Sequence, residues 1–327
     1  VDDCPVYHPE ARESDEVRAR RNAAPSQAPL ADAQGAVPLL LDTPNIASKK
    51  WVYEQYDSTV QASTAIAPGG DAGVFHVPGT TFGVAVTVDC NGRLVALDPY
   101  EGGKSTVAEA ARNVACTGAL PLGITDNLNF GNPQKPEVFH QFREACRGIG
   151  EACRAFETPV TGGNVSLYNE SPTGAVYPTP TVGMIGLLER VDQAVRSHFA
   201  APGDEVVILG DTAGHLGGSA YWAEVRSFVG GTVAPVDLAA ERRLQLLLVA
   251  AARAGLPRSA HDCSEGGLAV TIAEAAIGGP YQAEAFGADL DLAGYGPADD
   301  VGLLYGEDAG RVVLSCRTAD RDALLAL

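Results

Sequence analysis

The sequence predicts an α/β domain over residues 43–190, followed by an α+β domain over residues 191–327. Strand-like and helical patterns alternate in the first region, which is the order expected of an α/β unit. Ala201-Pro202-Gly203-Asp204 is a turn sequence, after which a new set of strands and helices begins. A chain of 327 residues is also long enough for about two domains, each with its own core.

The segment before the first domain, residues 1–42, is polar and charged at first and then rich in Ala, Pro and Gln. This composition predicts a connector that is partly disordered. A helix is expected just after Thr43-Pro44-Asn45, because an Asn side chain can cap a helix N-terminus.

The first domain is expected to contain several strands and two long helices. Valine-rich residues 81–90 and 93–98 read as two strands joined by a hairpin at Asn91-Gly92. Helix patterns follow at 104–117 and 136–156, and strands at 120–126 and 181–188. The 136–156 pattern is the clearest, because eight apolar residues share one helical face: Val138, Phe142, Ala145, Cys146, Ile149, Ala152, Cys153 and Phe156.

The second domain is expected to begin with a buried strand at 205–210. A helix at 238–254 should stop near Gly255 and Pro257. Residues 261–270 should open another helix, and residues 311–316 read as a strand.

Composition limits the classes of partner. The formal charge of −18 argues against nucleic acid, because a phosphate backbone requires basic clusters. It does not exclude a nucleotide, since Mg²⁺ can bridge carboxylates and phosphates. A mean hydropathy of +0.01, with no run of ~20 apolar residues, indicates a soluble protein without a membrane span. The seven cysteines form no CxxC pair and are expected to be reduced and packed as small hydrophobes, which fits a cytoplasmic protein.

The glycine-rich segment TPVTGGNVSLYNE (158–170) is the most informative stretch. A short extended run opens into Gly162-Gly163, whose backbone N–H groups can approach a phosphate. Asn164 and Ser166 can then ligate Mg²⁺ or hydrogen-bond an anion. Ordinary turn chemistry explains the same residues, so this segment alone does not decide between the two.

Longer segments point to a known family. The chain from 97 to 170 and the segments 43–57, 67–77, 177–189, 261–276 and 303–315 closely resemble, in order, the second half of phosphoribosylformylglycinamidine synthase. This is the ATP-dependent synthase of the fourth step of purine synthesis. The resemblance implies a domain like the N-terminal domain of aminoimidazole ribonucleotide synthetase, followed by that enzyme's C-terminal type of domain. It also implies that an N-terminal half, carrying the catalytic His, and the end of the last domain lie outside this sequence, which begins with Val1.

The resemblance assigns two groups of residues. At the catalytic site, Asp126 and Gly163 match ATP contacts, Asn164 matches a Mg²⁺ ligand and Ser166 matches a substrate contact. In long single-chain relatives a second, non-catalytic nucleotide is bound. Its contacts match Gly70 and Ser264, and its Mg²⁺ ligands match four further positions: Asp71, Glu109, Asn113 and Asp262. An ADP is the possible occupant.

Two tempting motifs are set aside. EGGKS (101–105) resembles the end of a phosphate-binding P-loop, but Asp98 stands where that motif requires Gly. A turn before a helix explains the glycines, with Lys104 in solvent or near a ligand. His261 could titrate near neutrality, yet a lone His beside a helix start is more often structural than a general base.

The implied reaction converts formylglycinamide ribonucleotide, ATP and glutamine-derived ammonia to formylglycinamidine ribonucleotide, ADP and phosphate, through an iminophosphate. The implied partners are the missing half, a glutaminase subunit and a small accessory subunit. Two alternatives remain open. One is another ATP-dependent enzyme of the superfamily, such as selenophosphate synthetase or thiamine-monophosphate kinase. The other is a catalytically silent, nucleotide-stabilised scaffold.

Overall fold

A six-stranded sheet forms the first half of the molecule in the computed structural model, which describes residues 6–26, 33, 35–279 and 285–327. Its strand order is β1-β2-β3-β8-β4-β5, and all neighbours are antiparallel except the parallel pair β4 and β5. The strands span Thr64–Ile66 (β1), Gly73–His76 (β2), Gly83–Asp89 (β3), Leu120–Asn129 (β4), Val160–Ser166 (β5) and Thr179–Leu188 (β8).

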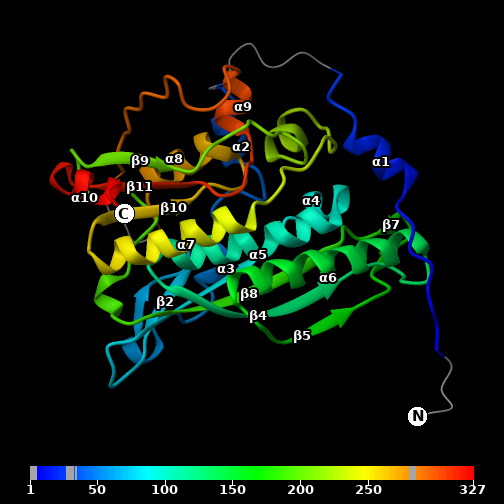
Figure 1. Ribbon diagram of the computed structural model, residues 1–327, viewed down its shortest axis with the longest axis horizontal. Coiled ribbons are helices and arrows are strands. Elements are labelled where there is room, and N and C mark those ends of the chain that lie inside the picture. Colours follow the sequence, from blue (N-terminus) through cyan, green and yellow to red (C-terminus); the bar gives the residue numbers. More distant parts are fainter. Residues whose placement is uncertain (1–5, 27–32, 34, 280–284) are drawn as a thin grey trace.

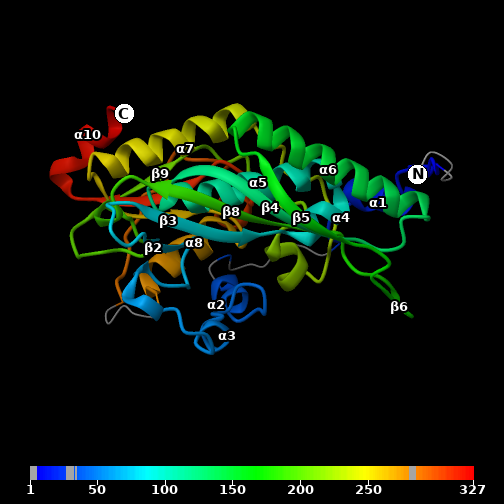
Figure 2. The ribbon, with the colours of Figure 1, turned by 90° about the horizontal axis from the view of Figure 1, so that it is seen from below.

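The three longest helices lie on one face of this sheet. The long helices α5 (Pro99–Cys116) and α6 (Pro136–Phe156) lie on that side, together with α7 (Leu238–Arg253) of the second half (Figure 2). The predicted apolar face of α6 is confirmed, since Ala145, Ile149 and Phe156 belong to the main core with Ile124 of β4. On the opposite face Val86 and Val88 of β3 and Ile185 of β8 are 43%, 71% and 44% exposed. The sheet therefore presents a partly apolar, uncovered face.

The second half is built on a three-stranded antiparallel sheet of order β10-β11-β9. Its strands and helices are β9 (Glu205–Leu209), α7, β10 (Pro257–Asp262), α8 (Gly267–Ile277), α9 (Asp300–Tyr305), β11 (Val312–Cys316) and α10 (Arg321–Leu325). Ala115 and Cys116 of α5 pack in one cluster with Leu244 and Leu248 of α7, so the two halves share apolar contacts (Figure 1).

The described parts of residues 1–42 are not a featureless connector. Helix α1 (Asp15–Arg21) is capped by Ser14, and Arg21 forms an ion pair with Asp98. Helix α2 (Ala36–Leu41) buries Ala36 and Leu40 against Tyr221 and Tyr305 of the second half. The expectation of a partly disordered connector did not include these two helices; residues 1–5, 27–32 and 34 lie outside the described residues.

Several local predictions need correction. Residues 92–97 form a helix, α4 (Gly92–Leu97), rather than the second strand of a hairpin, because the Asn91 side chain accepts the backbone N–H groups of Arg93 and Leu94 as a cap. The helix expected after Asn45 is only the four-residue α3 (Lys50–Tyr53). Short strands β6 (Glu170–Ser171) and β7 (Gly174–Ala175) form a small hairpin that was not predicted.

The EGGKS segment lies inside α5, which begins at Pro99 with Asp98 as its cap, so the rejection of a P-loop is confirmed. Its glycines allow close helix packing: a Cβ on Gly103 would lie 2.5 Å from the backbone oxygen of Ala145 in α6. Lys104 is buried rather than solvated, and its Nζ lies 2.8 Å from Glu101 Oε1.

Candidate functional sites

The glycine-rich segment forms an edge strand rather than a turn. Residues 160–166 are β5, which pairs only with β4 and is exposed along almost its whole length. The parallel register sets Asp126 beside Gly163, Asn127 beside Asn164 and Asn129 beside Ser166. Asp126 is thus within β4 rather than at its end, three residues before the strand stops.

This register places the four predicted catalytic-site residues on opposite faces of the sheet. Asp126 lies on the same face of β4 as the buried Ile124 and Leu128, so it faces the helices. A Cβ on Gly163 would collide with the Asp126 carboxylate. Asn164 lies on the uncovered face, where its Nδ2 donates to Asn127 Oδ1 over 3.4 Å. A ligand that contacts both pairs must therefore pass across the edge strand, and at Gly162 a Cβ would meet nothing within 4 Å.

Local contacts leave these side chains available to a ligand. Partial burial raises the pKa of Asp126. Ser166 lies on the uncovered face, and its Oγ donates to Asn169 Oδ1 over 3.2 Å. The Asn169 amide donates in turn to the backbone oxygens of Phe130 and Ser166, at 3.0 and 2.9 Å. Asn169 therefore fixes the end of β5, a role that the sequence did not suggest.

The second predicted group converges on one cavity. A cavity of about 800 Å³ between the two halves is lined by all six residues assigned to the auxiliary nucleotide: Gly70, Asp71, Glu109, Asn113, Asp262 and Ser264. They come from the β1–β2 loop, one face of α5 and the end of β10 with the loop after it. Residues 45–49 and Tyr53 close another side.

Two of the cavity's carboxylates are neutralised by cations of the chain itself. His261 Nδ1 lies 2.5 Å from Asp71 Oδ1, and His261 Nε2 lies 3.3 Å from Glu274 Oε2. Arg112 Nε lies 2.6 Å from Asp262 Oδ1, and the same guanidinium contacts Glu241. Both Asp71 and Asp262 are therefore engaged across the boundary between the two halves.

Burial sets the charge state of these groups. It disfavours the charge on His261, but the carboxylates of Asp71 and Glu274 outweigh it, so the pKa of His261 is raised well above its usual range. Burial raises the pKa of Glu109 well above its usual range, with Asp89 and Asp262 adding to the effect. It also raises the pKa of Asp89 to about 7. The cavity thus holds more carboxylates than its own cations neutralise.

The donor set suits Mg²⁺ by chemistry, because hard cations prefer carboxylate and amide oxygens. Within the described ranges, however, no three His, Cys, Asp or Glu side chains are grouped closely enough to hold a metal ion. Asp71 and Asp262 would have to leave or share their ion pairs to ligate one. The expected convergence on one cavity is observed, and a preformed metal cage is not.

Two neighbours of the assigned cavity residues were not identified from the sequence. Asp89 accepts a hydrogen bond of 3.1 Å from Asn113 Nδ2, and Arg112 holds Asp262. Arg112 lies three residues after Glu109 on the same helix, and this spacing could have indicated that the two side chains face the same cavity. His261 acts as a bridge between two carboxylates, in agreement with its structural interpretation. Ser264 is not a side-chain cap of α8, because Gly266 occupies the N-cap position.

Comparison with known proteins identifies the family. The model of the AIR synthase related protein N-terminal domain matches residues 69–188, and that of the C-terminal domain matches residues 201–327. The chain belongs to the AIR synthase related proteins. The two halves of the structure are therefore the two domains of that family, in the expected order.

A curated family member matches the whole length of this chain. The phosphoribosylformylglycinamidine synthase subunit PurL of Moorella thermoacetica is 48% identical over 331 residues, which cover 100% of this chain and 44% of that protein. The chain thus spans less than half the length of the relative that it matches.

Solved structures show the same fold. T. maritima PurL complexed with FGAR has a TM-score of 0.64 at 18% identity, covering 85% of this chain and 43% of its own. T. maritima PurL complexed with ATP has a TM-score of 0.59 at 20% identity, covering 83% and 38%. A Thermus thermophilus protein has a TM-score of 0.55 at 26% identity, covering 80% and 83%.

Two simple expectations can also be compared with the structure. The six described cysteines are free thiols, as predicted, and Cys4 lies outside the described residues. None of the helices in the described part of the chain has the length and apolar character that crossing a membrane requires.

Proposed function

We propose that this chain is part of an ATP-dependent synthase that makes formylglycinamidine ribonucleotide from formylglycinamide ribonucleotide and ammonia. The 48% identity to the Moorella PurL along the entire chain carries this proposal. The family resemblance assigns Asp126, Gly163, Asn164 and Ser166 to the catalytic site, and the register of β4 and β5 brings them to one short stretch of sheet edge.

The chemistry requires activation of an amide. An amide oxygen leaves poorly, so ATP first phosphorylates it and ammonia then displaces phosphate from the iminophosphate. Asp126 and Gly163 are assigned to ATP, Asn164 to Mg²⁺ and Ser166 to the ribonucleotide substrate. When bound, Mg²⁺ offsets charge on the transferring phosphoryl group. An uncovered edge strand suits a ligand that extends around both of its faces.

The proposed partners follow from what this chain leaves exposed. The uncovered face carries Val86, Val88 and Ile185, an apolar patch that calls for a covering surface. The missing N-terminal half of the same synthase is the proposed cover, and it would also supply the catalytic His. A glutaminase subunit delivers ammonia and a small accessory subunit helps assembly. We propose a cytoplasmic location for this complex, in keeping with the free thiols.

The 800 Å³ cavity supports a second, non-catalytic role: binding ADP with Mg²⁺. Gly70 and Ser264 are assigned to the nucleotide, and Asp71, Glu109, Asn113 and Asp262 to the metal. In this role the two domains act as a nucleotide-stabilised scaffold for the catalytic edge. The cavity between the domains therefore favours a nucleotide-stabilised scaffold as the second candidate function of the isolated chain.

The catalytic assignment is tested in the complete synthase with Asn164→Ala and Ser166→Ala. Both side chains lie on the uncovered face, so truncation should leave the core intact. Losing a metal contact or charge-assisted hydrogen bond costs about 1.5–3 kcal/mol, which is roughly a 10- to 150-fold loss of rate. Ser171→Ala, on the exposed hairpin strand β6, is the matched control.

Product formation from formylglycinamide ribonucleotide, ATP, Mg²⁺ and ammonium is measured alongside the melting temperature. Normal kinetics in both variants would refute the assignment. Rate loss that simply follows a lower melting temperature would favour a structural role. Turnover of a different acceptor, such as selenide or thiamine monophosphate, would instead support another enzyme of the superfamily.

A further inference from the structure

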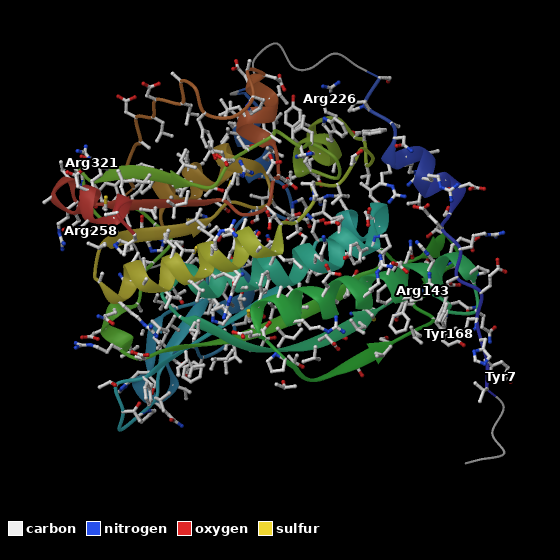
Figure 3. The ribbon with its side chains drawn as sticks, in the orientation of Figure 1. Tyr7, Arg143, Tyr168, Arg226, Arg258 and Arg321 are labelled. Carbon is white, nitrogen blue, oxygen red and sulfur yellow. The ribbon has the colours of Figure 1, made fainter. Side chains whose placement is uncertain are left out.

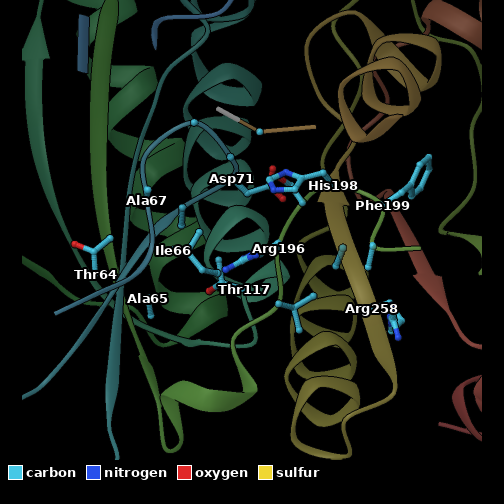
Figure 4. Close-up of a pocket in the computed structure, with 18 of the residues that line it drawn as sticks. Thr64, Ala65, Ile66, Ala67, Asp71, Thr117, Arg196, His198, Phe199 and Arg258 are labelled. Atoms are coloured by element: carbon cyan, nitrogen blue, oxygen red, sulfur yellow. The ribbon is translucent and has the colours of Figure 1, made fainter. Parts of the chain in front are cut away.

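A second cavity lies between the domains and is not explained by the proposed function. Its volume is about 600 Å³, within the range of roughly 300–1,000 Å³ typical of small-molecule sites. One wall is formed by residues 64–72 of the first domain, and the facing wall by residues 195–200 and part of β10. Figure 4 shows these walls on either side of the space, with Arg196 beside Ile66 and Thr117.

The charge of this cavity is opposite to that of the first. Arg196 and Arg258 line it, whereas Asp71 is the only carboxylate among its described lining residues. The Asp71 carboxylate is matched by His261, 2.5 Å away. Burial and the neighbouring Arg196 lower the pKa of His198, so that imidazole is neutral near pH 7. A chain of net charge −18 thus carries a locally cationic pocket, which attracts anions.

The two arginines differ in availability. Arg258 Nε lies 3.5 Å from Asp204 Oδ2, so part of its charge is already matched. Arg196 is an exposed residue that lines the cavity, and its backbone is held by the hydrogen bond from Ala260 N to Arg196 O at 2.9 Å. A guanidinium on a fixed backbone presents paired donors suited to a phosphate.

The rest of the lining is mainly apolar. Ile66, Val195 and Phe286 form walls, and small residues widen the space between them: Ala65, Ala67, Ala72, Ala200 and Ala260. Thr64 and Thr117 add hydroxyl groups. Apolar walls with a few polar groups and a cationic side fit a ligand with a flat ring at one end and a phosphate at the other.

We propose that this cavity binds a small phosphorylated compound with a heterocyclic ring, of the nucleoside monophosphate class, without a metal ion. The phosphate lies against Arg196, with Arg258 adding to the field, and the ring lies against Ile66 and Phe286. Metal independence follows from the cationic lining, in contrast to the carboxylate-rich nucleotide cavity.

The two cavities share one wall. Gly70, Asp71, Ser197 and His198 line both of them. A Cβ on Gly70 would lie 2.6 Å from Ser197 Oγ, so the loop and the interdomain segment are in close contact there. An occupant of either cavity therefore contacts the same loop, and the test has to separate the two sites.

Titration calorimetry of the 327-residue chain with AMP, in the presence of EDTA, tests the proposal. We expect saturable binding without Mg²⁺. Arg196→Ala removes a charge-assisted contact and should weaken AMP binding roughly 10- to 150-fold. Ala67→Trp should fill the cavity and abolish binding. Arg190→Ala is the matched control, because it removes an exposed arginine, paired with Asp192, that does not line the cavity.

Two further measurements assign the ligand class and the site. Ribose 5-phosphate, which lacks the ring, should bind at least tenfold more weakly than AMP. Glu109→Gln, in the other cavity, should leave AMP binding in EDTA unchanged. Circular dichroism checks that each variant is folded. If Ala67→Trp does not fold, the affinity of Arg196→Ala for AMP decides whether the ligand binds in this cavity.

The outcomes that overturn the proposal are distinct from failure of the synthase function. No AMP binding in EDTA, or binding that requires Mg²⁺ and falls in Glu109→Gln, would rule out this cavity. Equal affinity of Arg196→Ala and Arg190→Ala for AMP would show that Arg196 does not bind the phosphate. Equal affinity of the wild-type chain for AMP and ribose 5-phosphate would show that the ring is not recognised. None of these results affects catalysis at Asn164 and Ser166, which is measured separately.

Discussion

The β4–β5 edge and the 800 Å³ cavity between the domains differ in how exposed their residues are. At the edge, a strand exposed on both faces carries Asp126 and Gly163 on one side and Asn164 and Ser166 on the other. In the cavity, six predicted residues from three segments line one space between the two domains. The two sites also lie toward different ends of the molecule: Tyr168, just beyond β5, and Arg258, in β10 beside the cavities, are far apart along its length (Figure 3).

The difference between the two sites is that the chain supplies all the described walls of one and only a single wall of the other. The cavity is lined by both domains of one chain, and ion pairs of Arg112 and His261 join those domains, so its walls are in place without a partner. The edge has no opposing wall in the described structure. Binding energy at the edge must come partly from another surface, whereas binding in the cavity depends on displacing ion pairs already present.

The largest expected effect separates the two sites by catalysis. The 327-residue chain alone should make no formylglycinamidine ribonucleotide, because the edge proposed to be catalytic lacks a covering wall in the described structure. Product is measured from substrate, ATP, Mg²⁺ and ammonium, with the complete synthase as the positive control. Turnover by the chain alone comparable to the complete protein would show that the edge is a finished site.

Arg112→Ala tests whether internal ion pairs build the cavity. The substitution leaves Asp262 and Glu241 buried without their shared cation, so the free energy of unfolding should fall by about 3–5 kcal/mol. Urea unfolding measures this loss. Arg190→Ala, which breaks an exposed pair with Asp192, should cost no more than about 1 kcal/mol. Equal losses would mean that the buried network is not a principal support.

Mg²⁺ with ADP should stabilise the isolated chain through the cavity. Binding at 100 times the dissociation constant contributes about 2.7 kcal/mol, seen as a higher melting temperature. Glu109→Gln should reduce this shift, while Asn164→Ala, at the edge, should leave it intact. An unchanged melting temperature in the wild-type chain would count against the auxiliary nucleotide, as would an equal shift in Glu109→Gln.

The smallest expected effect concerns carboxylate crowding in the cavity. Burial and the nearby Asp262 raise the pKa of Asp89 from 3.8 to about 7, so its contribution to stability is complete below about pH 4 and is lost as the pH rises through 7. Asp89→Asn removes that loss. The variant should gain about 1–3 kcal/mol relative to wild type between pH 4 and pH 8.

Denaturant unfolding at the two pH values measures this difference. Glu137→Gln, at an exposed carboxylate whose pKa is lowered by Arg12, serves as the control, because any pH effect there should have the opposite sign. A constant difference between Asp89→Asn and wild type from pH 4 to pH 8 would exclude crowding at Asp89.

Periodic segments were predictable from the sequence, and capped or short ones were not. The 136–156 helix was predicted with its correct bounds, because its apolar stripe repeats over almost six turns. Residues 93–98 were misassigned because Asn91-Gly92 indicated a hairpin turn, whereas the Asn91 side chain caps a helix there. Gly162-Gly163 read as a turn, yet pairing with β4 holds them extended.

The sequence by itself determined the family, the order of the two domains and six of the residues that line the 800 Å³ cavity. These motifs are defined by residue identity and spacing along the chain, so they can be recognised without knowledge of the fold. Only the tertiary structure decided that Asp126 and Asn164 lie on opposite faces, because a strand's period of two acts only once the register is set. It likewise decided that Asp71 and Asp262 are held by His261 and Arg112, since those pairs form only where the two domains meet.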